Sequence, residues 1–280
     1  MSDKKNIVKK KYNNITYMEN IEHLIIIRFS CYFPERSEME KDKKKLLDRN
    51  RLNLRFELFE KFCLWSLVHQ TTKNFKIIIV YDKDLHKIYV DRLKSLIELY
   101  DFIIMHKWDT EYKLHENKWL QCYIDKNKKY LITTRIDDDD IINLRLNEMF
   151  YKLFVYNLRK YGSYNNSLIS FKGGKFIYKN KERFQIAPCN YPTAAIFLSY
   201  CSSINDSQNI YARDHAEIEF DKKMRIYRFP NCWGILNHEF NNDSTRRTRM
   251  FRKEQTEDIQ YKKIYDLFSS PSDYNKGPFQ

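Results

Sequence analysis

A chain of 280 residues, 42% of them hydrophobic and 16% aromatic, can bury a sizeable core, which excludes an intrinsically disordered protein. The net charge of +13 suits nucleic acid, an anionic membrane surface or an anionic small substrate, and alone selects none of them. Six cysteines without a two-residue spacing favour reduced thiols over a zinc ribbon or a disulfide frame. Without a signal-like start or an apolar run of about 18 residues, we expect a cytoplasmic protein with no transmembrane segment.

Apolar periodicity predicts alternating strands and helices over the first 160 residues. A β-branched run at residues 23–29 predicts the first strand, and an apolar stripe at helical spacing predicts a helix over residues 48–69. The alternation continues with strands at 75–81, 102–105 and 130–136 and with helices at 84–99, 115–126 and 141–160. This order predicts an α/β fold, with a parallel sheet and helices on both faces.

The second half of the sequence has a different pattern. Short apolar runs at 168–171, 175–178 and 195–198 are joined by Gly- and Pro-containing segments, which predicts hairpins and irregular loops. A short helix from about Asp214 and a strand at 224–229 follow. We therefore predict a basic flexible arm at 1–21, one α/β domain at 22–240 with an irregular second half, and a polar charged tail at 241–280.

Four consecutive aspartates, Asp137 to Asp140, directly follow the strand predicted at 130–136. In parallel sheets, ligands bind beyond the carboxyl ends of the strands. Adjacent carboxylates repel one another unless a cation neutralises them, and oxygen ligands suit Mg²⁺ or Mn²⁺ together with substrate phosphates. A solvated acidic turn is the alternative. The buried strand before the run favours the metal site.

Residues 134–140, with the sequence Thr-Arg-Ile-Asp-Asp-Asp-Asp, resemble the Asp-x-Asp element of GT-A glycosyltransferases, and their surroundings are most similar to the rhamnosyltransferase family of bacteria and large DNA viruses. Further segments similar to the family occur in the family's order along the chain: 23–29, Arg55-Phe56 with Phe59, 64–70, Asn74-Phe75, Tyr81-Asp82 and 232–238. The resemblance covers about residues 22–240. It implies a Rossmann-like mixed sheet and sugar transfer, with rhamnose a candidate sugar. Trp65-Ser66 in place of Pro-Ser, and Ile27 in place of Thr, leave the donor open.

The resemblance also implies roles for the acidic run. Asp139 would coordinate the cation that bridges the donor diphosphate. Asp137 would bind the donor ribose or share the metal. Asp138, between them, would contribute to donor binding. Asp140 would contact the metal-binding carboxylates without binding the cation itself.

Basic and aromatic residues near the first two strands complete the predicted donor site. Arg28 and Phe29 end the first strand and would contact the nucleotide, as would Asp82 at the end of the second, although Asp82 suits a turn equally well. Arg51 and Arg55, one helical turn apart, would reach phosphate or form surface ion pairs. Fixed positive charge of this kind stabilises a departing diphosphate.

Two residues of the second half complete the prediction. The segment at 213–217 resembles the acidic element that opens a helix facing the acceptor in inverting GT-A enzymes, which makes Asp214 the candidate general base. Asp is also a preferred helix N-cap, so both roles stay open. His238 follows a predicted strand, where some GT-A enzymes place a metal-ligating His; a structural His is the alternative.

The predicted function is therefore metal-dependent, inverting transfer of a sugar from a nucleotide donor, a UDP-sugar by preference, to a glycan or other hydroxyl acceptor. One alternative is a basic nucleic-acid-binding protein without catalysis, but the periodicity places most aromatic residues in the core, so we expect no nucleic-acid partner. Another is a metal-dependent phosphohydrolase, whose nucleophilic Asp would follow an early strand; here that strand ends in Arg28-Phe29. For a viral member, the compartment would be the host cytoplasm.

Overall fold

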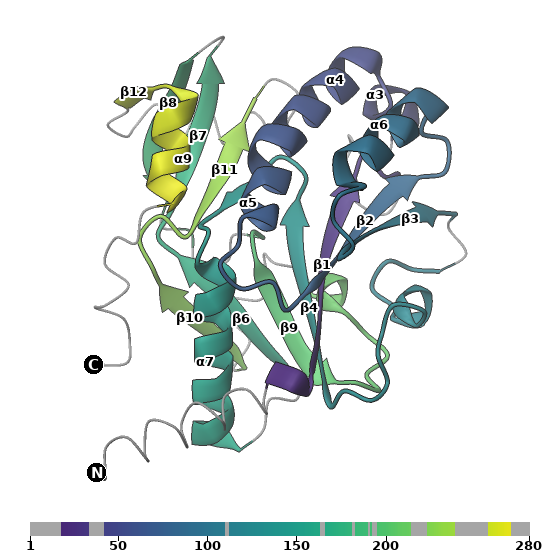
Figure 1. The fold of residues 1–280 in the computed structure, drawn as a ribbon, viewed down its shortest axis with the longest axis vertical. Coiled ribbons are helices and arrows are strands. Elements are labelled where there is room, and N and C mark those ends of the chain that lie inside the picture. Colours follow the sequence, from purple (N-terminus) through teal and green to yellow (C-terminus); the bar gives the residue numbers. More distant parts are fainter. Residues whose placement is uncertain are drawn as a thin grey trace.

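The computed structural model describes residues 18–33, 42–109, 112–162, 166–180, 183–189, 191, 195–213, 223–238 and 257–269. Within them the strands form a seven-stranded sheet in the order β10-β6-β9-β4-β1-β2-β3 and a five-stranded sheet in the order β12-β8-β7-β11-β5 (Figure 1). The strands of the larger sheet are β1 (Ile21–Phe29), β2 (Lys76–Asp82), β3 (Ile103–Trp108), β4 (Tyr130–Asp137), β6 (Ser167–Lys172), β9 (Leu198–Ser203) and β10 (Met224–Arg228).

The larger sheet confirms the predicted mixed α/β fold with a parallel N-terminal half. β1 pairs in parallel with β2 and with β4, and β2 pairs in parallel with β3, whereas β9 runs antiparallel to both of its neighbours. The chain builds outward from β1 to β3 and then returns to the other side of β1 to form β4. The strand order therefore reverses between β1 and β4, which is the position where open α/β sheets bind ligands.

One face of this sheet, which we call the helical face, is covered by α-helices. It receives every second side chain of β1, such as Ile25, Ile27 and Phe29. Packed on it are α4 (Arg49–Leu58), η1 (Phe59–Leu64) and α5 (Trp65–Val68), which run on without a break, with α6 (Lys87–Ile97) and α7 (Leu146–Tyr161). α4 and α6 lie near each other (Figure 1), because the Phe56 ring stacks on Tyr89 at 5.6 Å. The predicted apolar stripes therefore form the core of this face.

The opposite face, which we call the loop face, carries only short helical segments among the described residues. Its core is covered by loops and by two single-turn 3₁₀ helices, η2 (Lys118–Leu120) and η3 (Ile210–Ala212). The helix predicted at 115–126 is reduced to η2. Asn117 Nδ2 donates to the backbone oxygens of Asp206 and Gln208, both at 2.8 Å, and Trp119 Nε1 donates to Leu114 O at 3.1 Å. Such side-chain-to-backbone bonds compete with helical ones.

The smaller sheet is formed mostly by the second half of the chain. Its strands are β5 (Ile141–Ile142), β7 (Gly174–Asn180), β8 (Arg183–Cys189), β11 (Trp233–Asn237) and β12 (Glu257–Ile259). β5 pairs with β11, so α7 begins at Leu146 and not at 141 as predicted. β8 replaces a loop predicted around Pro188, and β9 lies at Leu198–Ser203, largely beyond the predicted 195–198.

The C-terminal segment was predicted to be a polar tail, and this prediction is wrong for residues 257–269. β12 pairs with β8, and α9 (Tyr261–Ser269) buries Ile264 and Phe268 against the smaller sheet. Phe268 packs over Gly234 of β11, where an added Cβ would lie 2.8 Å from its ring. The helical spacing of Ile264 and Phe268 was a signal that the overall polarity of the segment concealed.

The N-terminal boundary is close to the prediction. β1 begins at Ile21, one residue inside the predicted arm, and the Asn20 carbonyl accepts hydrogen bonds from the amides of Lys129 and Tyr130 at 2.9 and 3.0 Å. Residues 1–17 of the arm and the short helix predicted from Asp214 lie outside the described residues. No helix of the described chain is long and apolar enough to cross a membrane.

Candidate active site

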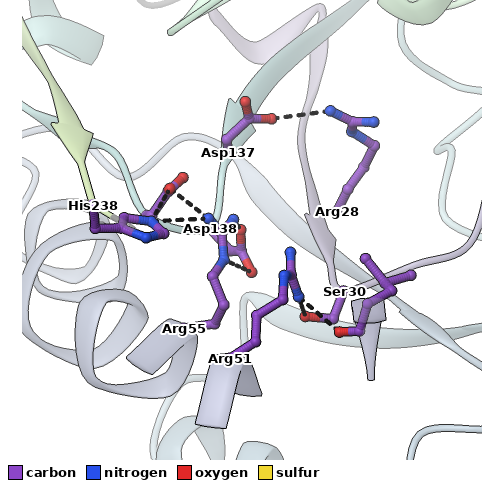
Figure 2. A network of polar contacts seen from close by, with 9 residues as sticks. Arg28, Ser30, Arg51, Arg55, Asp137, Asp138 and His238 are labelled. Carbon is purple, nitrogen blue, oxygen red and sulfur yellow. Dashed lines mark hydrogen bonds and ion pairs between the residues drawn. The ribbon is translucent and has the colours of Figure 1, made fainter. Parts of the chain in front are cut away.

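Charged residues gather where β1 and β4 end side by side. Arg28 and Asp137 are register partners across these parallel strands. The acidic run then turns, with the Asp140 amide bonded to Asp137 O at 3.2 Å, before β5 begins. Figure 2 shows Asp137 facing Arg28, whereas Asp138 faces Arg55. The run is therefore split between two groups of side chains, and its four carboxylates do not converge on one point.

The first group, the loop-face site, consists of Arg28, Arg135, Asp137 and Tyr211. Arg28 Nη2 lies 3.3 Å from Asp137 Oδ1, and the Asp137 side chain is 32% exposed. The guanidinium groups of Arg28 and Arg135 lie 5.5 and 5.3 Å from the centroid of the Tyr211 ring. Desolvation acts to raise the pKa of Asp137, but Arg28 and Arg135 outweigh it, so that pKa lies below its ordinary value.

Among the described residues, positive charge predominates in the loop-face site. Two guanidinium groups face the Tyr211 ring, and the Asp137 carboxylate pairs with Arg28. Arg135 is 3% exposed, and its Nε has no hydrogen-bond partner among the described residues. A buried guanidinium N–H without an acceptor is costly, and an anion entering beside it would supply one. The site is therefore suited to bind an anionic ligand.

The second group, the buried ion cluster, consists of Arg55, Asp138, Asp139 and His238. Arg55 Nε donates to Asp138 Oδ2 at 3.2 Å, and the same guanidinium pairs with Asp139. His238 Nε2 lies 3.0 Å from Asp139 Oδ2. None of the four side chains is more than 10% exposed. Burial lowers the pKa of His238 even though Asp139 opposes this, so a neutral imidazole would donate its Nε2 proton to Asp139.

Arg55 and Arg51, which sequence spacing grouped together, have different partners. The N-cap Asp48 accepts hydrogen bonds from the amides of Asn50 and Arg51 and so fixes the start of α4. Arg51 Nη1 donates to Ser30 Oγ at 3.0 Å and to Leu46 O at 2.8 Å, as Figure 2 shows for Ser30. Ser30 follows β1 with a left-handed backbone (φ 47°). Arg51 thus secures the loop after β1, and Arg55 meets the acidic run.

Two residues predicted to contact the nucleotide have structural partners. The Asp82 carboxylate accepts from the amides of Tyr32 at 3.0 Å and Asp84 at 2.9 Å, and lies 3.0 Å from Lys43 Nζ. These contacts agree with the alternative of a turn residue. Phe29 has no exposed surface and packs on Phe56 and Phe59, with centroid distances of 4.7 and 5.4 Å. A ring in that position belongs to the core of the helical face.

The predicted metal ligands do not come together as a set. Among the described residues, no group of three or more His, Cys, Asp and Glu side chains is placed to hold a metal ion. Asp139 and His238 are in contact, but Asp137 pairs with Arg28 on the other face, and Arg55 already pairs with Asp139. The arrangement therefore does not fit a cation held by Asp137, Asp139 and His238, and a Mn²⁺ or Mg²⁺ requirement stays a prediction.

The candidate base Asp214 lies outside the described residues, which stop in this segment at Arg213. Sequence reasoning missed Arg135 and Tyr211. An arginine inside the apolar strand 130–136, two residues before the acidic run, was the available signal, because a buried strand position rarely holds an unpaired charge. Nothing local in the sequence distinguishes Tyr211 from the other tyrosines.

The class of protein and then its family follow from a family comparison. The class is that of the α/β glycosyltransferases. A family model described as "Putative rhamnosyl transferase" matches residues 22–250, and the chain belongs to this family. A search of curated proteins found no match.

Solved structures show only distant similarity. TarS of S. aureus in complex with UDP-GlcNAc is 10% identical, with a TM-score of 0.43 over 80% of this chain and 61% of that chain. A 4-diphosphocytidyl-2C-methyl-D-erythritol synthase from Anaerococcus prevotii is 14% identical, with a TM-score of 0.34 over 83% and 96%. Mouse xyloside xylosyltransferase 1, apo form, is 8% identical, with a TM-score of 0.28 over 54% and 53%. At this distance no residue role is transferred. This chain spans 61% of the TarS 1–349 chain and 36% of the chain in another TarS structure.

Proposed function

We propose that this glycosyltransferase moves a sugar from a nucleoside-diphosphate donor to a hydroxyl group of a glycan or similar acceptor, and that the donor binds at the loop-face site. The family points to rhamnose as the sugar. The observation that carries the proposal is the pair of guanidinium groups, Arg28 and Arg135, around Tyr211 at the point where the strand order reverses.

The chemistry of a nucleotide sugar matches this pair. Guanidinium groups bind phosphate oxygens through charge-assisted hydrogen bonds, and Arg135 has a donor to spare. When the glycosidic bond to the diphosphate breaks, negative charge develops on the leaving group, and fixed positive charge stabilises it in the transition state. Asp137 is partly exposed beside Arg28, and its lowered pKa favours the ionised form, so it would accept hydrogen bonds from ribose hydroxyls.

The acceptor hydroxyl must lose its proton as it attacks the sugar. Asp214 is the proposed base, since it follows η3, whose Tyr211 contacts both arginines of the loop-face site, by two residues in sequence. Direct attack of the acceptor on the donor would invert the anomeric configuration. A retained configuration in the product would argue for a different mechanism.

A donor screen tests the function. The purified chain would be incubated with UDP-, dTDP- and GDP-sugars, including UDP-rhamnose, and release of the nucleoside diphosphate followed by chromatography, with and without Mn²⁺ and chelator. We expect turnover of one donor class, lost in Arg135→Met. Arg145→Met is the matched control, because Arg145 pairs with Glu148 at the start of α7. Phosphate release from any nucleotide would indicate a phosphohydrolase, and no turnover of any donor would contradict the proposal.

A further inference from the structure

The buried ion cluster contains a positive charge where the family resemblance would place a metal ion. Arg55 reaches the acidic run from α4 and pairs with Asp138 and with Asp139. Asp138 has no exposed side-chain surface, and the side chains of Asp139 and Arg55 are 7% and 10% exposed. Carboxylates so deeply buried need a counterion, and in this structure a side chain of the chain itself provides it.

Arg55 and a divalent cation would compete for the same oxygen. Asp139 Oδ2 is the atom that both the Arg55 guanidinium and His238 Nε2 contact. Arg55 Nη1 also lies 3.5 Å from His238 Nε2, so the guanidinium stands beside both residues of the Asp139–His238 pair. A cation bound there would face the positive guanidinium at contact distance, and like charges so close in a buried site repel strongly.

We propose that Arg55 is the resident counterion of the acidic run in the free protein, and that its pairing with Asp139 excludes a divalent cation from that carboxylate. Asp138 then acts as the anchor that holds Arg55 in place, because it offers a carboxylate buried on the same side. The proposal concerns the free protein and does not depend on which reaction the chain catalyses.

Calorimetric titration with MnCl₂ alone, without any nucleotide, tests the proposal. Replacing the guanidinium by an uncharged chain of similar length, Arg55→Met, should tighten Mn²⁺ binding at least tenfold relative to the unmodified protein. Arg51→Met is the matched control: Arg51 lies one turn earlier on the same helix and bonds to Ser30 Oγ and Leu46 O, so its loss should change Mn²⁺ affinity much less than the loss of Arg55. The double variant Arg55→Met with Asp139→Asn should lose the gain.

Thermal melting keeps the test valid if Arg55→Met folds poorly. Removing Arg55 leaves two buried carboxylates without their partner, so the melting temperature should fall, and Mn²⁺ should restore it more than it stabilises the unmodified protein. Two results would overturn the proposal. In one, the unmodified protein binds Mn²⁺ through Asp139 as tightly as Arg55→Met does. In the other, Mn²⁺ neither binds nor stabilises Arg55→Met.

Discussion

The two groups of charged side chains at the end of β1 and β4 use the same residue types in different surroundings. In the loop-face site, the Asp137 side chain is 32% exposed, and the described residues include two arginines and one carboxylate. In the buried ion cluster, Arg55 is enclosed by two carboxylates and a neutral His238. The first group is partly exposed, whereas the charges of the second are buried and paired with one another. These surroundings favour the proposal that the ligand binds at the loop-face site and that the buried ion cluster contributes to stability.

The largest expected effect is a difference in the free energy of unfolding between variants of the two groups. Asp138→Leu leaves the buried Arg55 with one carboxylate fewer, and breaking a buried ion pair costs about 3–5 kcal/mol. Asp137→Asn keeps the shape and an acceptor oxygen for Arg28 in a partly exposed pair, so we expect a loss of about 1 kcal/mol or less. Urea denaturation of both variants measures the difference. Equal losses would mean that the two groups do not differ as described.

The next effect concerns catalysis. Asp214→Asn removes the proposed base but keeps the shape and most of the capping ability, and a positioned carboxylate contributes about 10²–10⁴-fold. We expect sugar transfer to slow at least a hundredfold, with donor affinity unchanged. Asp91→Asn is the control, since Asp91 pairs with Lys87 on the surface of α6. Near-normal transfer by Asp214→Asn would leave that residue as a cap alone.

A smaller effect sharpens the assignment of binding to the loop-face site. Arg28→Met removes one charge-assisted contact to phosphate, and we expect the dissociation constant for UDP to rise about tenfold, or about 1.4 kcal/mol. The melting temperature should change little. The measurement is calorimetric titration with UDP, repeated for Arg51→Met, whose hydrogen bonds hold the loop after β1. A larger loss of affinity in Arg51→Met would place the ligand nearer α4.

An effect of similar size, seen only at acid pH, concerns a third buried polar group on the same strands. His23 in β1 bonds to Tyr151 Oη at 3.0 Å and to Thr134 Oγ1 at 2.8 Å, and burial lowers its pKa to about 3. In the unfolded chain, His23 takes up a proton near pH 6.5, whereas in the folded protein it stays neutral at that pH. Stability is therefore complete above pH 6.5 and falls as the pH drops toward 3, with about 1.4 kcal/mol lost at pH 5.5.

His23→Gln should flatten this part of the pH profile, as measured by urea denaturation at pH 7.5 and 5.5. A profile as steep as that of the unmodified protein would mean that another group, such as those of the buried ion cluster, causes the acid sensitivity.

The helical face could be predicted from the sequence because its information is local. Apolar residues at helical spacing and β-branched runs specify α4, α6, α7 and the parallel strands almost independently of one another. The loop face could not be predicted in this way. Asn117 and Trp119 are held by hydrogen bonds to backbone atoms, and the partners of Asn117 lie about ninety residues away in sequence. α9 was not predicted for a similar reason: Ile264 and Phe268 are buried only through their packing against the smaller sheet, which is formed by strands distant in sequence.

The site was predictable in content but not in arrangement. The acidic run, Arg55 and His238 were all found from motif and spacing, and the structure brings Asp139, Arg55 and His238 together. Strand alternation then sends Asp137 to the opposite face, where it meets Arg28. A motif written as consecutive letters does not reveal that split, and it gave no reason to select Arg135.

Hydrogen–deuterium exchange with and without UDP tests the central claim most directly, because it locates the ligand without any substitution. The described chain also has a cavity of about 600 Å³ at the amino ends of β1 and β2, lined by Glu22, His23 and Lys76, so the two ends of the same strands can be compared. We expect UDP to slow exchange in peptides covering residues 26–33 and 133–140 and to leave peptides covering 18–24 and 74–77 unchanged. Slower exchange confined to the amino-end peptides would contradict donor binding at the loop-face site.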